Sequence, residues 1–295
     1  MRRAALLLLA FGALAFWALT IPWRLPDTAI ASAPGDPSRG ARLFWAGGCA
    51  SCHAPAAARG DDRLKLPGGA PLKTPFGSFY APNISPHSDG IGSWTLTDFA
   101  NAMQKGVSPE GRHYYPAFPW TSYARMTATD IADLFAFLQS LPPVAGKAPQ
   151  TSLAFPYNIR RGLGLWKLAF APGTSPVITL PANAPAAVKT GQYLVEGPGH
   201  CGECHTPRTL SGLGSLDTKN WLTGAAAAEG DGKVPAINPG ALKWSAADIA
   251  YYLESGFTPD YDSVGGSMAS VQRNMAELPA EDRAAIAAYL KALPE

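Results

Sequence analysis

The chain opens with a continuous apolar stretch. Arg2 and Arg3 precede Ala4–Trp23, a run of twenty residues without a charged side chain. At about 1.5 Å of rise per residue, a helix of this length spans a hydrocarbon core of about 30 Å. Basic residues before such a run favour a cytoplasmic N-terminus. The pattern predicts a single N-terminal transmembrane helix in a bacterial inner membrane, with the rest of the chain exported to the periplasm.

A cleavable signal peptide is the alternative, because Ala31–Ala33 has the A-x-A pattern of a cleavage site. The apolar run is longer than a usual signal core, and the candidate site lies ten residues beyond Trp23. We therefore favour an uncleaved anchor, followed by a short stalk over residues 24–36.

Helical periodicity marks the end of each half of the remaining chain. Asp130–Ser140 carries apolar residues at i, i+3, i+4 and i+7, which predicts a closing helix. Asp282–Leu293 shows a similar pattern and the same Leu-Pro ending. Short helices are expected at Ser38–Ala46 and Ala187–Val195. The fold class that follows is mostly α.

The two halves also share a signature between these helices. Trp94 and Trp244 are each followed by Asp at +4 and by Gly at +12. A common order of helices and signatures predicts the duplication of one unit. The expected organisation is an anchor and stalk (1–36), a first domain (37–145), a proline-rich linker (146–185) and a second domain (186–295).

The middle of the linker differs from its proline-rich ends. Residues 155–170 cluster apolar side chains around three basic ones. A short helix packed between the two domains is the favoured interpretation. A segment that lies on the membrane surface or on a partner subunit is the alternative.

Each half carries one C-x-x-C-H motif, Cys49–His53 and Cys201–His205. This motif attaches haem c, because its two cysteines form thioethers and its histidine coordinates the iron. A zinc half-site or a dithiol redox pair is the alternative. A zinc site needs four ligands close together, whereas the two pairs lie about 150 residues apart. The sequence predicts two covalently bound haems, held by Cys49, Cys52, His53, Cys201, Cys204 and His205.

The distal side of each haem needs either a second ligand or an open position. In the second half, Met268 lies in the glycine-rich stretch Gly265–Ala269, which is expected to form a loop across the haem. Methionine sulfur is a common distal ligand and raises the reduction potential. Met268 is the predicted ligand, and Met275 is its rival.

The first half offers a less clear distal ligand. Met103 falls on a predicted helix four residues after Phe99, which is typical of core packing. Met126 directly precedes the closing helix and is the predicted ligand. His113 is the alternative, and an open site is the third option. The remaining two histidines, His87 and His200, are interpreted as surface or supporting groups.

Composition adds two limits. The net charge is only +2, so nucleic-acid binding has no electrostatic support. The chain contains 30 glycines and 28 prolines, which indicates many loops. All four cysteines belong to the two motifs, so none remains for a disulfide.

With these motifs in place, the chain resembles the membrane-anchored dihaem cytochromes c that serve as electron-transfer subunits of bacterial periplasmic dehydrogenases. Alcohol, gluconate and fructose dehydrogenases have such subunits. The matching stretches are Thr74–Ile84, Gly111–Met126, Phe155–Leu168, His200–Arg208 and Phe257–Ala269.

The resemblance implies two tandem class I cytochrome c domains. It also implies that Asn83, Trp94 and Arg208 help to hold haem propionates. In many relatives a methionine stands at the position of Phe118, and this sequence departs from them there. The dehydrogenase subunits often carry three haem motifs, whereas this chain carries two.

The expected function is electron transport in the periplasm, with a dehydrogenase subunit as donor and an oxidase, a quinone or a soluble cytochrome as acceptor. No catalytic residues are predicted. A dihaem enzyme of the peroxidase or thiosulfate-oxidising type is one alternative, although two usable methionines and the lack of a spare cysteine argue against it. A free-standing shuttle to a terminal oxidase is the other alternative.

Overall fold

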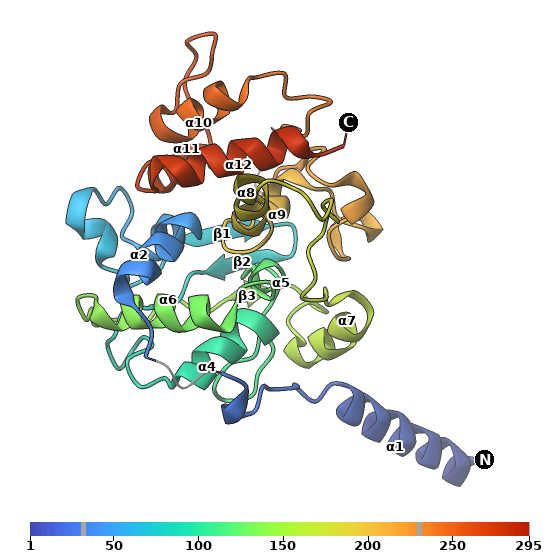
Figure 1. Cartoon of the computed structure of the whole chain (residues 1–295). Helices are drawn as coiled ribbons and strands as arrows, with labels where there is room; N and C mark the ends of the chain where they lie inside the picture. The colour runs from blue at the N-terminus through green and yellow to red at the C-terminus, as the bar shows by residue number, and fades with distance from the viewer. Residues whose placement is uncertain (31–33, 229–231, 295) are drawn as a thin grey trace.

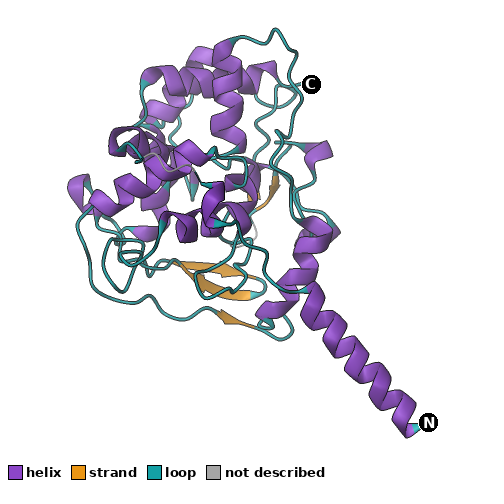
Figure 2. Ribbon diagram, turned by 60° about the horizontal axis from the view of Figure 1, so that its bottom comes forward, coloured by secondary structure: helices purple, strands orange, loops and turns teal. Residues whose placement is uncertain are grey.

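The computed structural model describes residues 1–30, 34–228 and 232–294. The candidate cleavage site Ala31–Ala33 lies outside the described residues. The chain is mostly helical, with a small three-stranded sheet near its centre (Figure 2). This observation confirms the predicted helical class.

The helix α1 (Arg2–Leu19) projects away from the rest of the molecule and has no buried residue (Figure 1). It is long and apolar enough to cross a membrane, by length and composition alone. The apolar run continues to Trp23, but the helix ends earlier. Pro22 disfavours helical geometry at the residue before it, which accounts for this end.

The segment after α1 is not the free stalk that the sequence suggested. It packs on the first unit, and Ile30 belongs to the core of that unit. A short 3-10 turn, η1 (Asp27–Ala29), lies within this segment. Docking of this kind has no local sequence signal, because the partners lie more than 70 residues away.

The first unit consists of helices that surround one hydrophobic core, with a β-hairpin on one side. Its elements are α2 (Pro37–Ala46), α3 (Cys49–His53), η2 (Gly60–Leu64), β1 (Pro71–Thr74), β2 (Gly77–Tyr80), α4 (Leu96–Ala100), η3 (Asn101–Lys105), α5 (Trp120–Tyr123) and α6 (Ala128–Ser140).

The second unit repeats this arrangement, with a shorter pair of strands than the first. Its elements are α8 (Ala186–Glu196), α9 (Gly202–His205), η5 (Leu210–Gly212), η6 (Thr218–Asn220), β4 (Ala225–Ala226), β5 (Lys233–Val234), α10 (Ala246–Ser255), α11 (Met268–Met275) and α12 (Ala280–Ala292). The strands β4 and β5 pair antiparallel.

A close helix crossing forms the centre of each unit. In the first, a Cβ atom at Gly40 of α2 would lie 2.0 Å from the carbonyl oxygen of Asp133 on α6. In the second, a Cβ atom at Gly191 of α8 would lie 1.9 Å from the carbonyl oxygen of Ala285 on α12. Only glycine permits such contact. Figure 1 shows α12 lying across α8.

Capping boxes begin the helices that follow Trp94 and Trp244. Thr95 and Asp98 form a capping box at α4, and Ser245 and Asp248 form the same box at α10. The helical stretch after α4 continues as the π-helical turn η3 and stops at Gly106, which has a φ of 57°. The helix α10 stops at Gly256, with a φ of 80°.

The linker holds two pieces of regular structure. The strand β3 (Ser152–Leu153) pairs with β2 and extends the hairpin to the antiparallel order β1-β2-β3. After the turn η4 (Arg160–Gly162), α7 (Leu163–Phe170) lies between the units. The ring of Trp166 on α7 packs edge-on against Trp120, and its Nε1 donates to the carbonyl of Leu213 at 2.7 Å. These contacts agree with the favoured interpretation of a helix packed between the two halves.

Candidate haem sites

Both C-x-x-C-H motifs fold into a single helical turn. Cys49–His53 forms α3, and Cys201 is the N-cap of α9, which ends at His205. Two residues between the cysteines place both sulfurs on one turn, with the histidine directly after them. This is the donor set that covalent haem attachment requires.

The histidine of each motif is oriented by a backbone carbonyl. His53 Nδ1 lies 2.7 Å from the carbonyl oxygen of Pro82, and His205 Nδ1 lies 2.7 Å from that of Pro235. A carbonyl only accepts, so the proton belongs on Nδ1 in both rings. The lone pair of each Nε2 is then available to an iron ion, an arrangement typical of metal-binding histidines. The residues present therefore fit a haem iron on the proximal side.

Burial favours the same neutral form of these rings. Desolvation lowers the pKa of His53 and of His205, while the carbonyl contacts raise it in part. Both imidazoles are therefore uncharged at neutral pH, as iron coordination requires.

The structure disfavours the two alternative uses of the cysteines. Burial raises the pKa of Cys49 and of Cys201 to about 12, whereas redox-active C-x-x-C pairs have a lowered pKa. Among the described residues, no group of three or more His, Cys, Asp or Glu side chains is placed to hold a metal ion. A zinc site at either motif therefore lacks its ligand set.

The backbone around the two motifs is the same. Gly68 N donates to the carbonyl of His53 at 2.8 Å, and Gly224 N donates to that of His205 at 2.7 Å. Farther along, Tyr114 N donates to Gly106, and Val264 N donates to Gly256, both at 2.7 Å. The duplication predicted from sequence is thus present in hydrogen bonds as well as in helix order.

The second motif contacts the first unit directly. Glu203 lies inside the second motif, and its Oε1 accepts from Thr121 Oγ1 at 2.6 Å and from Ser122 Oγ at 2.9 Å, both on α5 of the first unit. Its other carboxylate oxygen pairs with Arg208. A carboxylate of the second haem motif is therefore bound to the first unit.

A second contact starts one residue before the motif. His200 Nε2 lies 3.2 Å from the carbonyl oxygen of Gly47, which precedes the first motif by two residues. The ring of His200 packs edge-on against Tyr123, with 5.5 Å between centroids. Desolvation lowers the pKa of His200. This histidine joins the units rather than lying at the surface.

Side chains on α11 and α12 of the second unit also contact the first unit. Asn274 Nδ2, on α11, donates to Ser51 Oγ inside the first motif at 2.8 Å. Arg63 Nη1, on η2, pairs with Glu277 at 2.6 Å. Arg42 on α2 pairs with Asp282 on α12, at 2.5 and 2.7 Å. Sequence analysis missed these residues because each is an ordinary polar side chain whose partner lies far along the chain.

The residues suggested for propionate binding have other contacts. Asn83 is buried, and its Nδ2 donates to the carbonyls of Val144 and Gly146, while its Oδ1 accepts from Ser85. Arg208 is paired with Glu203. Trp94 packs on the core of the first unit. Propionate contact by these three residues stays a prediction.

The candidate distal methionines lie in different surroundings. Met268 is half-buried, packs against the core of the second unit and begins α11. Met268 is therefore the first residue of a helix, and the expected loop Gly265–Ala269 ends at Ser267. Met126 and Met103 are 3% and 6% exposed, and both belong to the core of the first unit. Met275, the rival of Met268, is also buried in the core.

The histidine alternatives are held elsewhere. His113 Nε2 donates to the carbonyl oxygen of Thr20 at 2.9 Å, beside the end of α1. His87 accepts a hydrogen bond from Asp89 N and is half-exposed. Coordination of iron by Met126 and Met268 stays a prediction at this point.

A helical unit with a covalent haem motif on one turn defines a c-type cytochrome, and comparison with known proteins agrees. The cytochrome c family model matches residues 37–142. The chain is 54% identical over 291 residues to a protein named diheme cytochrome c-type from Cereibacter sphaeroides. The aligned region covers 98% of this chain and 96% of that protein. The chain therefore belongs to the cytochrome c family and binds haem c.

Two further relatives are subunits of larger complexes. The fructose dehydrogenase cytochrome subunit of Gluconobacter japonicus is 33% identical over 96% of this chain and 60% of that protein. The cytochrome c subunit of the quinone-dependent alcohol dehydrogenase of Gluconacetobacter polyoxogenes is 34% identical over 92% of this chain and 59% of that protein. The chain spans about three fifths of these two relatives. These relationships confirm the prediction of an electron-transfer protein rather than an enzyme in its own right.

Proposed function

We propose that this protein is a dihaem cytochrome c that carries electrons in the periplasm, from a dehydrogenase toward the respiratory chain. Each unit is one class I cytochrome c domain with its own haem, attached at Cys49–His53 and at Cys201–His205. Bound haem supplies a one-electron couple. The protein supplies the thioether attachment, the proximal histidines and the surroundings that tune the potential.

The observation that carries this proposal is that each motif is hydrogen-bonded to the other unit across one interface. Ser51 of the first motif and Glu203 of the second each form a hydrogen bond to the other unit. Two redox centres that must exchange electrons need a short and fixed separation. A rigid contact built from the motifs themselves meets this need, whereas two independent carriers on a flexible linker need no such contact.

A dehydrogenase is the proposed electron donor because two relatives are named cytochrome subunits of dehydrogenases. The acceptor is an oxidase, a quinone or a soluble cytochrome.

The proposed membrane anchor is α1, retained in the mature protein. Thr20, at its end, is fully buried. The carbonyl of Thr20 accepts from His113, and its hydroxyl accepts from Arg161 Nε at 2.8 Å. A Cβ atom at Gly164 of α7 would lie 2.5 Å from the Cα atom of Thr20. A signal peptide destined for removal has no need of such fitted contacts with the mature protein.

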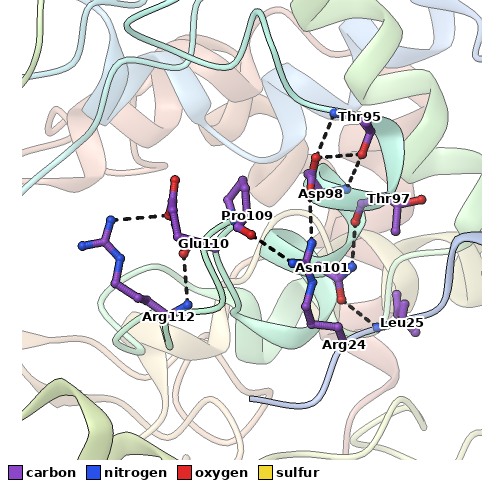
Figure 3. Close-up of polar contacts among 10 residues, drawn as sticks. Arg24, Leu25, Thr95, Thr97, Asp98, Asn101, Pro109, Glu110 and Arg112 are labelled. Carbon is purple, nitrogen blue, oxygen red and sulfur yellow. Dashed lines mark hydrogen bonds and ion pairs between the residues drawn. The ribbon is translucent and has the colours of Figure 1, made fainter. Parts of the chain in front are cut away.

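The next residues strengthen this argument (Figure 3). Arg24 pairs with Asp98 at 2.8 Å and donates to the carbonyl of Pro109 at 2.9 Å. Leu25 N donates to Asn101 Oδ1 at 2.7 Å. Cleavage after Ala33 removes all of these contacts.

Sequencing the N-terminus of the purified protein tests the anchor. We expect the mature chain to include Arg24 and to leave the membrane with detergent but not with high salt. A chain that begins at Pro34 and is released by salt contradicts the anchor. The same protein without residues 1–19 is a suitable control, because it keeps Thr20 and Arg24 but lacks the apolar helix.

Co-purification and substrate-driven reduction test the electron-transfer role. After extraction in mild detergent, we expect the chain to purify with a dehydrogenase and to contain two haems. Addition of that dehydrogenase's substrate should then reduce both haems. If the chain purifies alone, and no dehydrogenase preparation from the same membranes reduces it, a free-standing shuttle is the better description. A haem content of one per chain contradicts the dihaem assignment.

A further inference from the structure

The two units differ in the segment that leads to the closing helix. This connection lies between η3 and α6 in the first unit and between α10 and α12 in the second. Before it, the bridge Val107–His113 of the first unit matches the bridge Phe257–Ser263 of the second. Tyr114 and Val264 make the same hydrogen bond to Gly106 and Gly256. Residue numbers up to this point therefore correspond with an offset of 150.

The backbone also corresponds after the connection, but with an offset of 152. Gly106 lies against the ring of Trp120, and Gly256 lies against Gln272. Met126 N donates to the carbonyl of Tyr123, and Leu278 N donates to that of Met275. The connection is therefore the five-residue segment Tyr115–Pro119 in the first unit and the seven-residue segment Gly265–Val271 in the second.

Met268 lies in the middle of the longer connection, four residues after Val264. At the same spacing, Phe118 follows Tyr114. Phe118 is half-buried and packs on the core of the first unit, as Met268 packs on the core of the second. The shorter connection reads Tyr-Pro-Ala-Phe-Pro and holds no sulfur and no imidazole. The first unit thus lacks a methionine where the second has one.

No other side chain of the first unit replaces it at the corresponding place. With the two offsets, Met126 corresponds to Leu278 and Met103 to Leu253, and both leucines are buried in the second core. Leucine cannot coordinate iron, so the second unit uses these positions for core packing, and Met126 and Met103 are buried in the core of the first unit in the same way. This register argues against Met126 as the distal ligand.

The other candidate ligands of the first haem are a histidine that contacts another segment and two protonated tyrosines. The imidazole of His113 donates to Thr20. Tyr114 and Tyr123 pack edge-on against Phe118, and burial raises the pKa of both phenols, to about 12 for Tyr114. Protonated phenols are weak ligands of iron.

We propose that the haem of the first unit has an open distal position beside Phe118, which takes a small external ligand, whereas Met268 closes the haem of the second unit. The ligand class is a small neutral molecule that binds ferrous iron through one atom, with carbon monoxide as the probe. Binding forms one coordinate bond between iron and the probe, and no electron is transferred. The inference rests on the proposed attachment of two haems.

Titration of the reduced protein with carbon monoxide tests the inference. The full chain with both haems is extracted in detergent, reduced with dithionite without oxygen, and followed by its absorption spectrum. We expect carbon monoxide to bind one haem of each chain. In Met268→Leu, we expect binding to both haems. In Phe118→Met, we expect the added sulfur to close the first site and to abolish binding at low concentrations of the probe.

Met126→Leu is the matched control, since it copies the leucine of the second unit. It should bind carbon monoxide at one haem, as the unmodified chain does. The inference is overturned if the unmodified chain binds none while Met126→Leu binds one, because Met126 is then the ligand. It is also overturned if Met268→Leu binds no more than the unmodified chain, because Met268 is then not the residue that closes the second haem. Either failure leaves the haem count and the substrate-driven reduction unchanged, so the electron-transfer proposal is judged separately.

Discussion

The two units of this cytochrome share one proximal side and differ on the distal side. Both hold their motif histidine by a proline carbonyl at 2.7 Å and cross their two main helices at a glycine. The connections that carry the distal residues differ in length and chemistry, with Phe118 in one unit and Met268 in the other. The two units thus share the features that surround the haem motif, while the residue at the proposed distal position differs.

This difference predicts a direction for electron transfer within the chain. Methionine ligation raises the potential of a haem. A haem without this ligand has a lower potential, all else being equal. Electrons delivered to the first unit then pass downhill to the second, through the interface that joins the two motifs.

Breaking the shared helix crossing should have the largest effect. Gly40→Ala and Gly191→Ala each place a methyl group about 2 Å from a carbonyl oxygen. We expect each change to lower the free energy of unfolding by about 3 kcal/mol, at the upper end of the cost of overpacking. Denaturant unfolding followed by haem absorption measures this. Gly173→Ala, with its nearest atom at 3.9 Å, is the control and should change little. Unequal losses of unfolding free energy at Gly40 and Gly191 contradict the equivalence of the two helix crossings.

Phe118→Met should reduce the difference between the two units. The new sulfur is expected to raise the potential of the first haem on the order of 100 mV, within the range of about 0.8 V that axial ligands span. A redox titration of the full chain measures both potentials. An unchanged first potential shows that residue 118 does not reach the iron.

Glu203→Gln should weaken the contact between the second motif and the first unit. The change keeps the shape of the side chain but removes the charge that Thr121, Ser122 and Arg208 contact. We expect a loss of about 1–3 kcal/mol, the cost of disturbing buried hydrogen bonds to a charged group, and slower equilibration of electrons between the haems after rapid photoreduction. Glu281→Gln, at an exposed position at the start of α12, is the matched control. Equal equilibration rates in the two variants contradict the role of Glu203.

Met126→Leu should have the smallest effect. Leucine and methionine have similar volumes, so we expect a cost below about 1.5 kcal/mol and no change in either potential. Thermal unfolding and redox titration measure these quantities. A fall in the potential of the first haem identifies Met126 as its ligand and restores the assignment made from sequence.

Local signals in the sequence were enough for much of the fold. The two motifs, the shared Trp-Asp-Gly signature and the closing helices were predicted, and α6 and α12 begin within two residues of their expected starts. These features depend on neighbours a few positions away. The duplication followed from their common order.

The remainder depends on contacts between distant segments. The docking of Arg24 on Asp98, and of Glu203 on Thr121, joins residues 74 and 82 positions apart, and neither has a pattern of its own. The distal ligand of the first haem shows the same limit. Met126 was favoured because it directly precedes the closing helix, whereas the backbone register places a leucine at the corresponding position of the other unit. Its ligation of iron stays a prediction, because the sequence alone does not give the hydrogen bonds that define this register.

Electron paramagnetic resonance of the fully oxidised, detergent-extracted chain tests the central difference most directly. A haem with histidine and methionine ligands is low-spin, whereas a haem with an open or water-bound distal position is high-spin. The asymmetry of the two units predicts one low-spin and one high-spin haem in equal amounts, with Phe118→Met converting the high-spin signal. Two low-spin haems in the unmodified protein contradict it.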